Sequence, residues 1–263
     1  MLLGLARAFA ADSVFAGSTA PGQLLGAPVS SLSLQFGGNW TTGNTNAYTV
    51  TTGGSLARRW DRNRVSGTLA ASIGRARADA NGDGHLDAAE RAVAPIETAR
   101  KYAAEGRYDR YVGDRDSLYA LTGAAADPFA GHDLRAHGQL GFSRNFVTAR
   151  DRTLVGEAGA DVAREDRVEG TDPEIAWVVA ARVMAKGTYR FNPTVAAQAQ
   201  VEALDNVVAP GDLRVLSTIA LAARMARRLD FQVSSQLAWD RQPVEGFARL
   251  DQVTLASFVA NVP

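Results

Sequence analysis

A run of oxygen-bearing side chains between residues 79 and 90 has the spacing of a metal-binding loop. The run reads Asp79-Ala-Asn-Gly-Asp-Gly-His-Leu-Asp-Ala-Ala-Glu90. Asp79, Asn81 and Asp83 stand at positions one, three and five, where side-chain oxygens can turn toward one ion. Gly84, at position six, suits the sharp turn that such a loop needs. Hard oxygen ligands at this spacing suit calcium, because magnesium demands a smaller octahedral site.

The second half of the run completes the ligand set of an EF-hand loop. His85 would supply its backbone carbonyl, Asp87 would act through water, and Glu90 would bind through both carboxylate oxygens. Two features depart from the motif: Arg91 replaces the usual apolar residue, and a strand is predicted upstream instead of a helix. We therefore expect one unpaired site of weak affinity, on the order of 10⁻⁴ to 10⁻³ M. The alternative is a solvated Asn/Gly turn that binds nothing specific. The predicted calcium ligands are Asp79, Asn81, Asp83, His85, Asp87 and Glu90.

The three histidines offer little support for catalysis. His85 lies in the loop, His132 lies in a polar connection, and His137 lies on a predicted strand. A hydrolase would need a hydroxyl within reach of His137, and the candidates nearby in sequence are Ser117, Thr122 and Thr153. No G-x-S-x-G motif occurs. We therefore expect a protein that is not an enzyme.

Strict alternation of side-chain character identifies the elements that must hold the loop. In residues 134–142, Leu140 and Phe142 share one parity, whereas His137 and Gln139 share the other. Residues 229–240 repeat the scheme. Alternation over ten or more residues is typical of strands in a membrane-spanning β-barrel, which is apolar outside and polar inside. A large soluble β-sandwich is the alternative.

About twelve such stretches predict an all-β, antiparallel up-and-down transmembrane β-barrel. The predicted strands cover 31–40, 45–58, 64–77, 97–112, 116–126, 133–146, 152–165, 174–190, 194–206, 212–226, 228–240 and 247–261. Short links alternate with longer ones, which is typical of outer-membrane barrels with short periplasmic and long outer connections. Aromatic residues near strand ends predict interfacial girdles: Trp40, Trp60, Tyr111, Phe146, Tyr189, Phe191 and Trp239.

The barrel is predicted to occupy residues 31–263 as one domain, with 78–96 as an inserted EF-hand-like loop on the outer side. Residues 1–30 are predicted to form a signal-like, flexible lead-in, because Ala8-Phe-Ala10 resembles a small-x-small cleavage site. No run of eighteen apolar residues occurs, so no transmembrane helix is expected.

The polar parity of the strands carries charges of both signs toward the predicted lumen. They line either a selectivity-tuning pore or a narrow interior in which they neutralise one another. The residues are Arg135, Glu157, Asp161, Arg182, Lys186, Arg190, Glu202, Arg214, Arg224, Asp230 and Asp240.

Composition narrows the partners and the compartment. The 263-residue chain has a formal net charge of zero, so it has no basic field to attract nucleic acid. Cysteine is absent, which excludes disulfides and thiolate chemistry. We expect outer-membrane lipid, calcium, and small solutes or ions as partners, and the bacterial outer membrane as the location.

Three segments resemble the YdiY-like salt-induced outer-membrane proteins, a group built on a domain of unknown function. The segments are Gly37-Gly-Asn-Trp-Thr-Thr-Gly-Asn-Thr-Asn46, Arg115-Asp116 followed by 134–146, and Trp239-Asp-Arg-Gln-Pro243 followed by Asp251. The resemblance covers roughly 34–260 and implies an outer-membrane barrel, with 79–95 as an insertion. It transfers no catalytic residues.

The first functional hypothesis is a non-enzymatic envelope protein, with a structural role, whose outer loop binds calcium. The second is a narrow solute or ion pore gated by that loop. The third is an outer-membrane hydrolase.

Overall fold

The computed structural model describes residues 29–41, 45–78, 87–169, 175–209, 211–243 and 248–262. Twelve strands account for most of them, joined by the short helix α2 (Ala88–Ala92) and the 3-10 turn η2 (Pro128–Ala130). The strands are β1 (Val29–Thr41), β2 (Thr45–Trp60), β3 (Asn63–Ala78), β4 (Ile96–Tyr111), β5 (Asp116–Asp127), β6 (His132–Thr148), β7 (Arg152–Arg167), β8 (Ile175–Asn192), β9 (Val195–Asn206), β10 (Leu213–Ala226), β11 (Leu229–Asp240) and β12 (Leu250–Val262).

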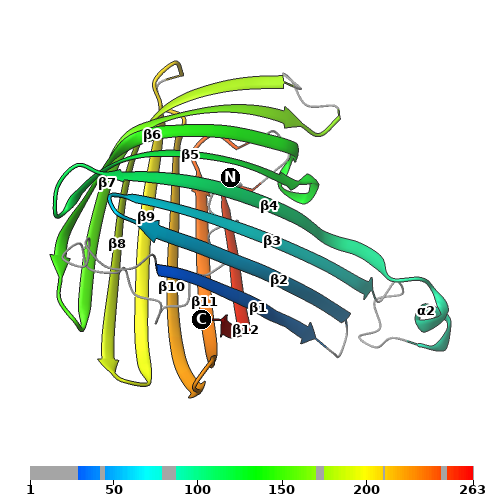
Figure 1. Cartoon of the computed structure of the whole chain (residues 1–263). Coiled ribbons are helices and arrows are strands. Elements are labelled where there is room, and N and C mark those ends of the chain that lie inside the picture. The colour runs from blue at the N-terminus through cyan, green and yellow to red at the C-terminus, as the bar shows by residue number, and fades with distance from the viewer. Residues whose placement is uncertain are drawn as a thin grey trace.

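The strands form one closed antiparallel barrel in which every strand pairs with its neighbours along the chain. The barrel closes where β1 pairs with β12, through a register that joins Phe36 to Phe258. Figure 1 shows two walls, with β1–β5 crossing in front of β8–β12. This architecture confirms the predicted up-and-down barrel and its twelve strands.

Strand positions match the prediction to within a few residues. The predicted strand 97–112 corresponds to β4, in spite of its many charged residues. Its charges are compatible with a strand because Lys101, Arg107 and Asp109 share the inward parity, whereas Arg110 faces outward at the strand end and bonds Asn63. The charge density of this strand therefore reflects a polar barrel interior.

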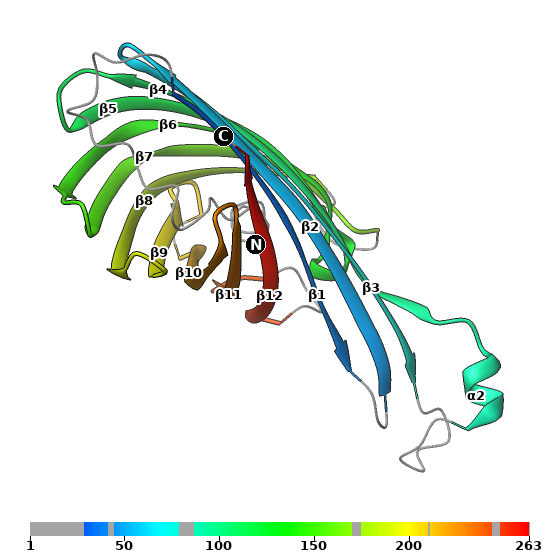
Figure 2. The same cartoon turned by 60° about the horizontal axis from the view of Figure 1, so that its bottom comes forward.

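Connection lengths differ between the two ends of the barrel. The links β2–β3, β4–β5, β6–β7, β8–β9 and β10–β11 are two to four residues long, and we call their end the short-link end. The other end, here the long-link end, carries links of up to seventeen residues, the longest joining β3 to β4. The alternation of link lengths is thus as predicted. Helix α2 belongs to this longest link and projects beyond the ends of β1–β3 (Figures 1 and 2).

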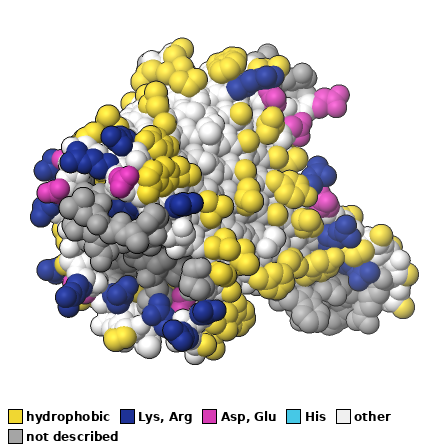
Figure 3. Space-filling view, in the orientation of Figure 1, with side chains coloured by type: hydrophobic (Ala, Val, Ile, Leu, Met, Phe, Trp, Pro, Cys, Tyr) yellow, Lys and Arg dark blue, Asp and Glu magenta, His cyan; other side chains and the backbone are white. Residues whose placement is uncertain are grey.

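The barrel is apolar outside and polar inside, which is the reverse of a soluble domain. Outward side chains such as Leu69 and Leu140 are 65% and 68% exposed, whereas the inward Arg135 and Gln139 are 2% exposed. Figure 3 shows apolar side chains over the front wall and most of its Lys and Arg at the end opposite α2. Lipid can cover such an exterior without exposing unpaired backbone groups, because the barrel has no free edge.

Aromatic side chains lie near several strand ends on the outer surface. Phe146, Tyr189 and Phe191 are 45–59% exposed near the short links, as the girdle prediction requires. Tyr111 behaves differently, because it has inward parity and Arg59 stacks 4.5 Å above its ring. The side chain of Trp40 lies outside the described residues.

Strand β8 departs from clean alternation because two of its apolar side chains face the interior. Val178 and Met184 fall on the polar parity of β8, and both are buried inside the barrel. Val178 packs with Leu204 and Leu216 in an apolar cluster that lines the interior near the long-link end.

None of the helices in the described ranges is long and apolar enough to span a membrane.

Candidate functional site

A row of four residues across β5–β8 builds the centre of the interior charge network. Tyr119, Gly141, Gly159 and Arg182 are successive register partners on these strands. Neither glycine carries a Cβ, so the Tyr119 side chain can pass close over β6 and β7. A Cβ added at Gly141 or Gly159 would lie 2.6 Å or 2.9 Å from the Tyr119 hydroxyl. The hydroxyl therefore reaches β8, where Arg182 Nη1 donates to it at 2.7 Å.

Arg182 is held by two carboxylates as well as by Tyr119. It donates to Glu157 Oε2 at 2.8 Å and to Glu202 Oε1 at 2.9 Å. Glu157 also accepts from Arg107, at 2.8 Å from Nη1, although Arg107 lies three strands away on β4. Arg107 stacks 4.3 Å above the Tyr119 ring. The four charged side chains of this group, Arg107, Glu157, Arg182 and Glu202, are largely buried. Each charge is therefore neutralised by a partner inside the barrel instead of by solvent.

A second charged group lies toward the long-link end. Arg135 Nη1 lies 3.4 Å from Glu165 Oε1, and Arg135 Nη2 lies 3.4 Å from Asp161 Oδ2. Arg214 on β10 bonds Glu165 on β7 and lies 3.3 Å from Asp240. The bond between Arg214 and Glu165 passes over β8 and β9. Both groups therefore connect strands that are not neighbours in the sheet.

Apolar side chains join the two walls beside these charges. Leu255 on β12 shares one buried cluster with Ala70 on β3 and Ala125 on β5. Ala70 and Ala125 are separated by β4, which places them roughly 10 Å apart. Among the buried members of the cluster only Leu255 can therefore link them, and it does so from the opposite wall, while the partly buried Ala103 on β4 packs against the same cluster. Val253 packs against the same cluster.

A cavity of about 350 Å³ lies on the long-link side of Leu255. Its walls include Thr51, Ser72 and Lys101, and Asp251 also lines it. Lys101 Nζ pairs at 2.8 Å with Asp127, whose side chain is fully buried. The cavity thus carries hydroxyl groups and charges of both signs, with Leu255 among its lining residues.

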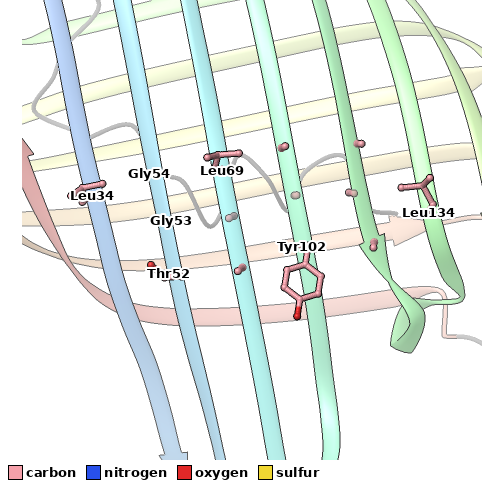
Figure 4. A pocket seen from close by; sticks show the side chains of 14 residues that line it. Leu34, Thr52, Gly53, Gly54, Leu69, Tyr102 and Leu134 are labelled. Atoms are coloured by element: carbon pink, nitrogen blue, oxygen red, sulfur yellow. The ribbon is translucent and has the colours of Figure 1, made fainter.

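A second depression, of about 570 Å³, lies on the outer surface of β1–β6 (Figure 4). Leu34, Leu69, Tyr102 and Leu134 stand around a floor of alanine and glycine. It faces the lipid-covered side of the wall, so its occupant would be apolar.

Only part of the predicted calcium loop can be located. Asp79, Asn81, Asp83 and His85 lie outside the described residues. Asp87 and Glu90 form a reciprocal capping box at the start of α2. The Glu90 amide donates to Asp87 Oδ1 at 2.8 Å, and the Asp87 amide donates to Glu90 Oε2 at 3.0 Å. Arg77 Nε on β3 bonds the carbonyl of Val93 at 3.0 Å, which ties α2 to the barrel. No group of three metal-ligating side chains occurs among the described residues.

His137 has a carboxylate neighbour, as a hydrolase would require. His137 Nδ1 lies 3.4 Å from Asp161 Oδ1, and the ring packs against Gly123. The Thr122 hydroxyl, however, donates to the His137 carbonyl and is exposed on the outer parity. Within the part of the chain that the structure describes, neither Ser117 nor Thr153 bonds the imidazole. The hydrolase hypothesis gains no support.

Sequence parity identified most of the interior charges but missed several important residues. Arg135, Asp161, Arg182 and Arg214 face inward as predicted, with at most 6% exposure. The missed residues are Lys101, Arg107, Asp109, Tyr119, Asp127, Glu165 and Leu255. Parity alone could have found Arg107 and Asp109, because they alternate with outward residues on β4. Tyr119 and Leu255 could not be found in this way, because their roles depend on register and on the opposite wall.

Comparisons with solved structures support the fold. The NanC porin superposes with a TM-score of 0.53 at 11% identity, covering 88% of this chain and all of the porin. An outer membrane channel from Pseudomonas putida F1 has a TM-score of 0.48 at 13% identity, covering 93% of this chain and all of the channel. The KdgM porin has a TM-score of 0.44 at 6% identity, covering 88% of this chain and 98% of the porin. The last two scores are too low to carry an argument.

The closed barrel and its apolar exterior place this protein in the outer membrane. The comparison with curated protein sequences gives no match. A family model described as "Protein of unknown function, DUF481" matches residues 34–262, which is most of the chain. The chain therefore belongs to the DUF481 family.

Proposed function

We propose that this protein is a non-enzymatic outer-membrane barrel with a structural role in the envelope. Its interior is closed to solutes, and its β3–β4 link binds calcium outside the cell. Within its family, we place it beside the YdiY-like salt-induced members, with the calcium loop as an insertion.

The contact of Leu255 with Ala70 and Ala125 carries the proposal of a closed interior. An apolar contact between opposite walls excludes water from that level of the lumen. The long ion pairs, such as Arg107 to Glu157, fill the adjacent part of the cross-section. Interior charges paired in this way serve the stability of the barrel, because an unpaired buried charge is costly.

Conductance in planar bilayers tests closure. The native chain should give no steady current steps. Replacing Leu255 and Val253 by serine should hydrate the apolar contact and produce ohmic steps. The control is Leu237→Ser, on the outer surface of β11, where a change should leave the bilayer silent. Ohmic steps from the native chain would contradict the closed interior.

The chemistry of the loop supports calcium as its ligand. Six candidate donors present hard oxygens, and the capping box already fixes Asp87 and Glu90 at one end of the loop. Bidentate binding by Glu90 would use Oε2, the oxygen that accepts from the Asp87 amide. Calcium binding would then order the start of α2 against the barrel, through the bond between Arg77 and Val93.

Titration calorimetry tests the calcium proposal directly. Calcium titrated into the folded protein in detergent should give a heat of binding, and the binding curve should correspond to a Kd on the order of 10⁻⁴ to 10⁻³ M. Glu90→Gln should abolish this signal, because it removes the charged bidentate ligand. Glu97→Gln, on β4 and paired with Arg100, should leave it intact. Absence of heat from the native chain at several millimolar calcium would refute the proposal.

A narrow pore gated by the loop is the second candidate. The cavity beside Lys101 and Asp251 favours it, because a hydrated mouth of about 350 Å³ would admit a small solute or ion. In that case the native chain would conduct, and removal of calcium would change the current. The same bilayer recordings therefore separate the two candidates.

A further inference from the structure

Outside the lumen, the short-link end of the barrel carries nine exposed arginines, which we call the basic rim. They are Arg58, Arg62, Arg110, Arg115, Arg144, Arg150, Arg152, Arg227 and Arg228. The aspartates outside the lumen at the same links are Asp61, Asp114, Asp116 and Asp151, so arginine exceeds aspartate by five. The whole chain has a net charge of zero, so the positive charge arises from placement and not from overall composition.

Four rim arginines stand at or just inside the edge of the apolar band, since the exposed Phe146 lies two residues nearer the short link than Arg144. On each of four strands, an outward arginine lies two residues nearer the short link than an exposed apolar side chain. The pairs are Leu56 and Arg58, Tyr108 and Arg110, Phe142 and Arg144, and Leu154 and Arg152. Two residues advance about 7 Å along a strand. The guanidinium groups therefore lie at the depth of lipid headgroups, with their stems along the apolar surface.

Few rim arginines have an acidic partner within the protein. Arg144 lies 3.5 Å from Asp116, and Arg110 bonds the amide oxygen of Asn63 at 2.8 Å. Among the described residues, no carboxylate lies within 4 Å of the other rim arginines. Two outward arginines at the long-link end differ, because Arg164 pairs with Asp166 at 3.1 Å. Arg100 there likewise pairs with Glu97, at 3.4 Å. The rim therefore presents arginine side chains whose positive charge can pair with an anion from outside the protein.

We propose that the basic rim binds the phosphate groups of anionic phospholipids in the periplasmic leaflet. A guanidinium group matches a phosphate with two parallel hydrogen bonds, which favours arginine over lysine at such a site. Three exposed aromatic residues at the same end place their rings at the same boundary between hydrocarbon and headgroups: Phe146, Tyr189 and Phe191. The short links face the periplasm in barrels of this class, so the leaflet is the phospholipid one. A headgroup in contact with one rim arginine should be favoured about fivefold over a zwitterionic one.

Native mass spectrometry of the folded protein measures this preference. The protein is transferred from micelles that contain equal amounts of phosphatidylglycerol, phosphatidylcholine and lipid A, and the retained lipids are counted by mass. The native chain should retain phosphatidylglycerol several-fold over phosphatidylcholine. The combined variant Arg58→Gln, Arg110→Gln, Arg144→Gln and Arg152→Gln should lose the preference, and 0.5 M salt in the micelle buffer should weaken it.

A matched variant controls for total charge. Arg75→Gln, Arg100→Gln, Arg164→Gln and Arg249→Gln remove four exposed arginines at the long-link end and should leave the preference intact. Heat-modifiable gel mobility shows that each variant is folded before the measurement. Equal retention of both phospholipids by the native chain would overturn the proposal, as would loss of preference only in the control. Retention of lipid A by the rim arginines would overturn the assignment to the periplasmic leaflet.

Discussion

Two regions of the barrel interior are built from different chemistry. The region formed by β4–β10 carries charged side chains whose bonds pass over intervening strands, as between Arg107 and Glu157. The region formed by β1–β3, β11 and β12, here the hydroxyl region, carries mainly buried hydroxyls and amides. These bond across short distances, with Ser33 and Ser55 oxygens 2.6 Å apart on adjacent strands. Gln35 likewise donates to Ser257 at 2.7 Å.

The difference shows that polar lumen residues have two structural roles. A hydroxyl pair such as Thr51 and Ser72 joins strands that the backbone already joins, because the two are register partners. An arginine that reaches three strands away fills the lumen and fixes the curvature of its wall. Loss of a charged partner should therefore cost far more than loss of a hydroxyl.

The largest expected effect follows from removing Arg182. Arg182→Met leaves Glu157 and Glu202 with one counter-charge fewer in a buried site, which should lower the free energy of unfolding by about 3 to 5 kcal/mol. Urea unfolding in detergent micelles measures this change. Arg164→Gln, which breaks an exposed pair with Asp166, should cost less than about 1 kcal/mol. Equal effects of the two variants would remove the distinction between interior and surface charges.

A moderate effect should follow from filling the space beneath Tyr119. Gly159→Ala places a methyl group against the backbone carbonyl oxygen of Leu140 and 2.9 Å from the Tyr119 hydroxyl, so β6 and the Tyr119 ring must both shift, at a cost of about 1 to 3 kcal/mol. Gly106→Ala is the matched control on β4, because an added Cβ there meets no atom within 4 Å. The same unfolding measurement applies. If Gly159→Ala were as harmless as Gly106→Ala, the row across β5–β8 would not depend on its glycines.

The smallest effects are expected in the hydroxyl region. Ser33→Ala should cost about 1 kcal/mol, because it leaves the Ser55 hydroxyl buried without this partner. The double variant Ser33→Ala, Ser55→Ala should recover most of that loss, since both polar groups are then removed. A double-mutant cycle from unfolding data gives the coupling. A double variant as unstable as Arg182→Met would contradict the difference between the two regions.

The sequence predicted the barrel well because period-two patterning survives in single strands. Residues 134–142 show it plainly, and their inward His137 and Gln139 are buried as predicted. Strand register could not be predicted in this way, because sliding a strand by two residues leaves every side chain on the same face of the sheet. The alignment of Tyr119 with Gly141 and Gly159 could not be read from the chain for that reason.

Contacts between the two walls could not be predicted from the sequence either. Leu255 reads as one more apolar residue in an alternating strand, and its inward direction runs against the simple rule of apolar outside. It faces inward because small residues, Ala70 and Ala125, leave room for it on the opposite wall. The calcium loop shows the reverse situation. Its spacing is explicit in the sequence, and its ligands from Asp79 to His85 lie outside the described residues.

A cysteine cross-link tests the central claim that the two walls meet through the lumen. The chain has no cysteine, so Ala125→Cys with Leu255→Cys creates a single pair. A short thiol-reactive cross-linker should join them in the folded protein and shift its gel mobility after denaturation. The pair Ala124→Cys with Leu255→Cys, in which Ala124 faces lipid, should remain unlinked. Failure of the first pair to cross-link, or equal linking of both pairs, would contradict a closed interior.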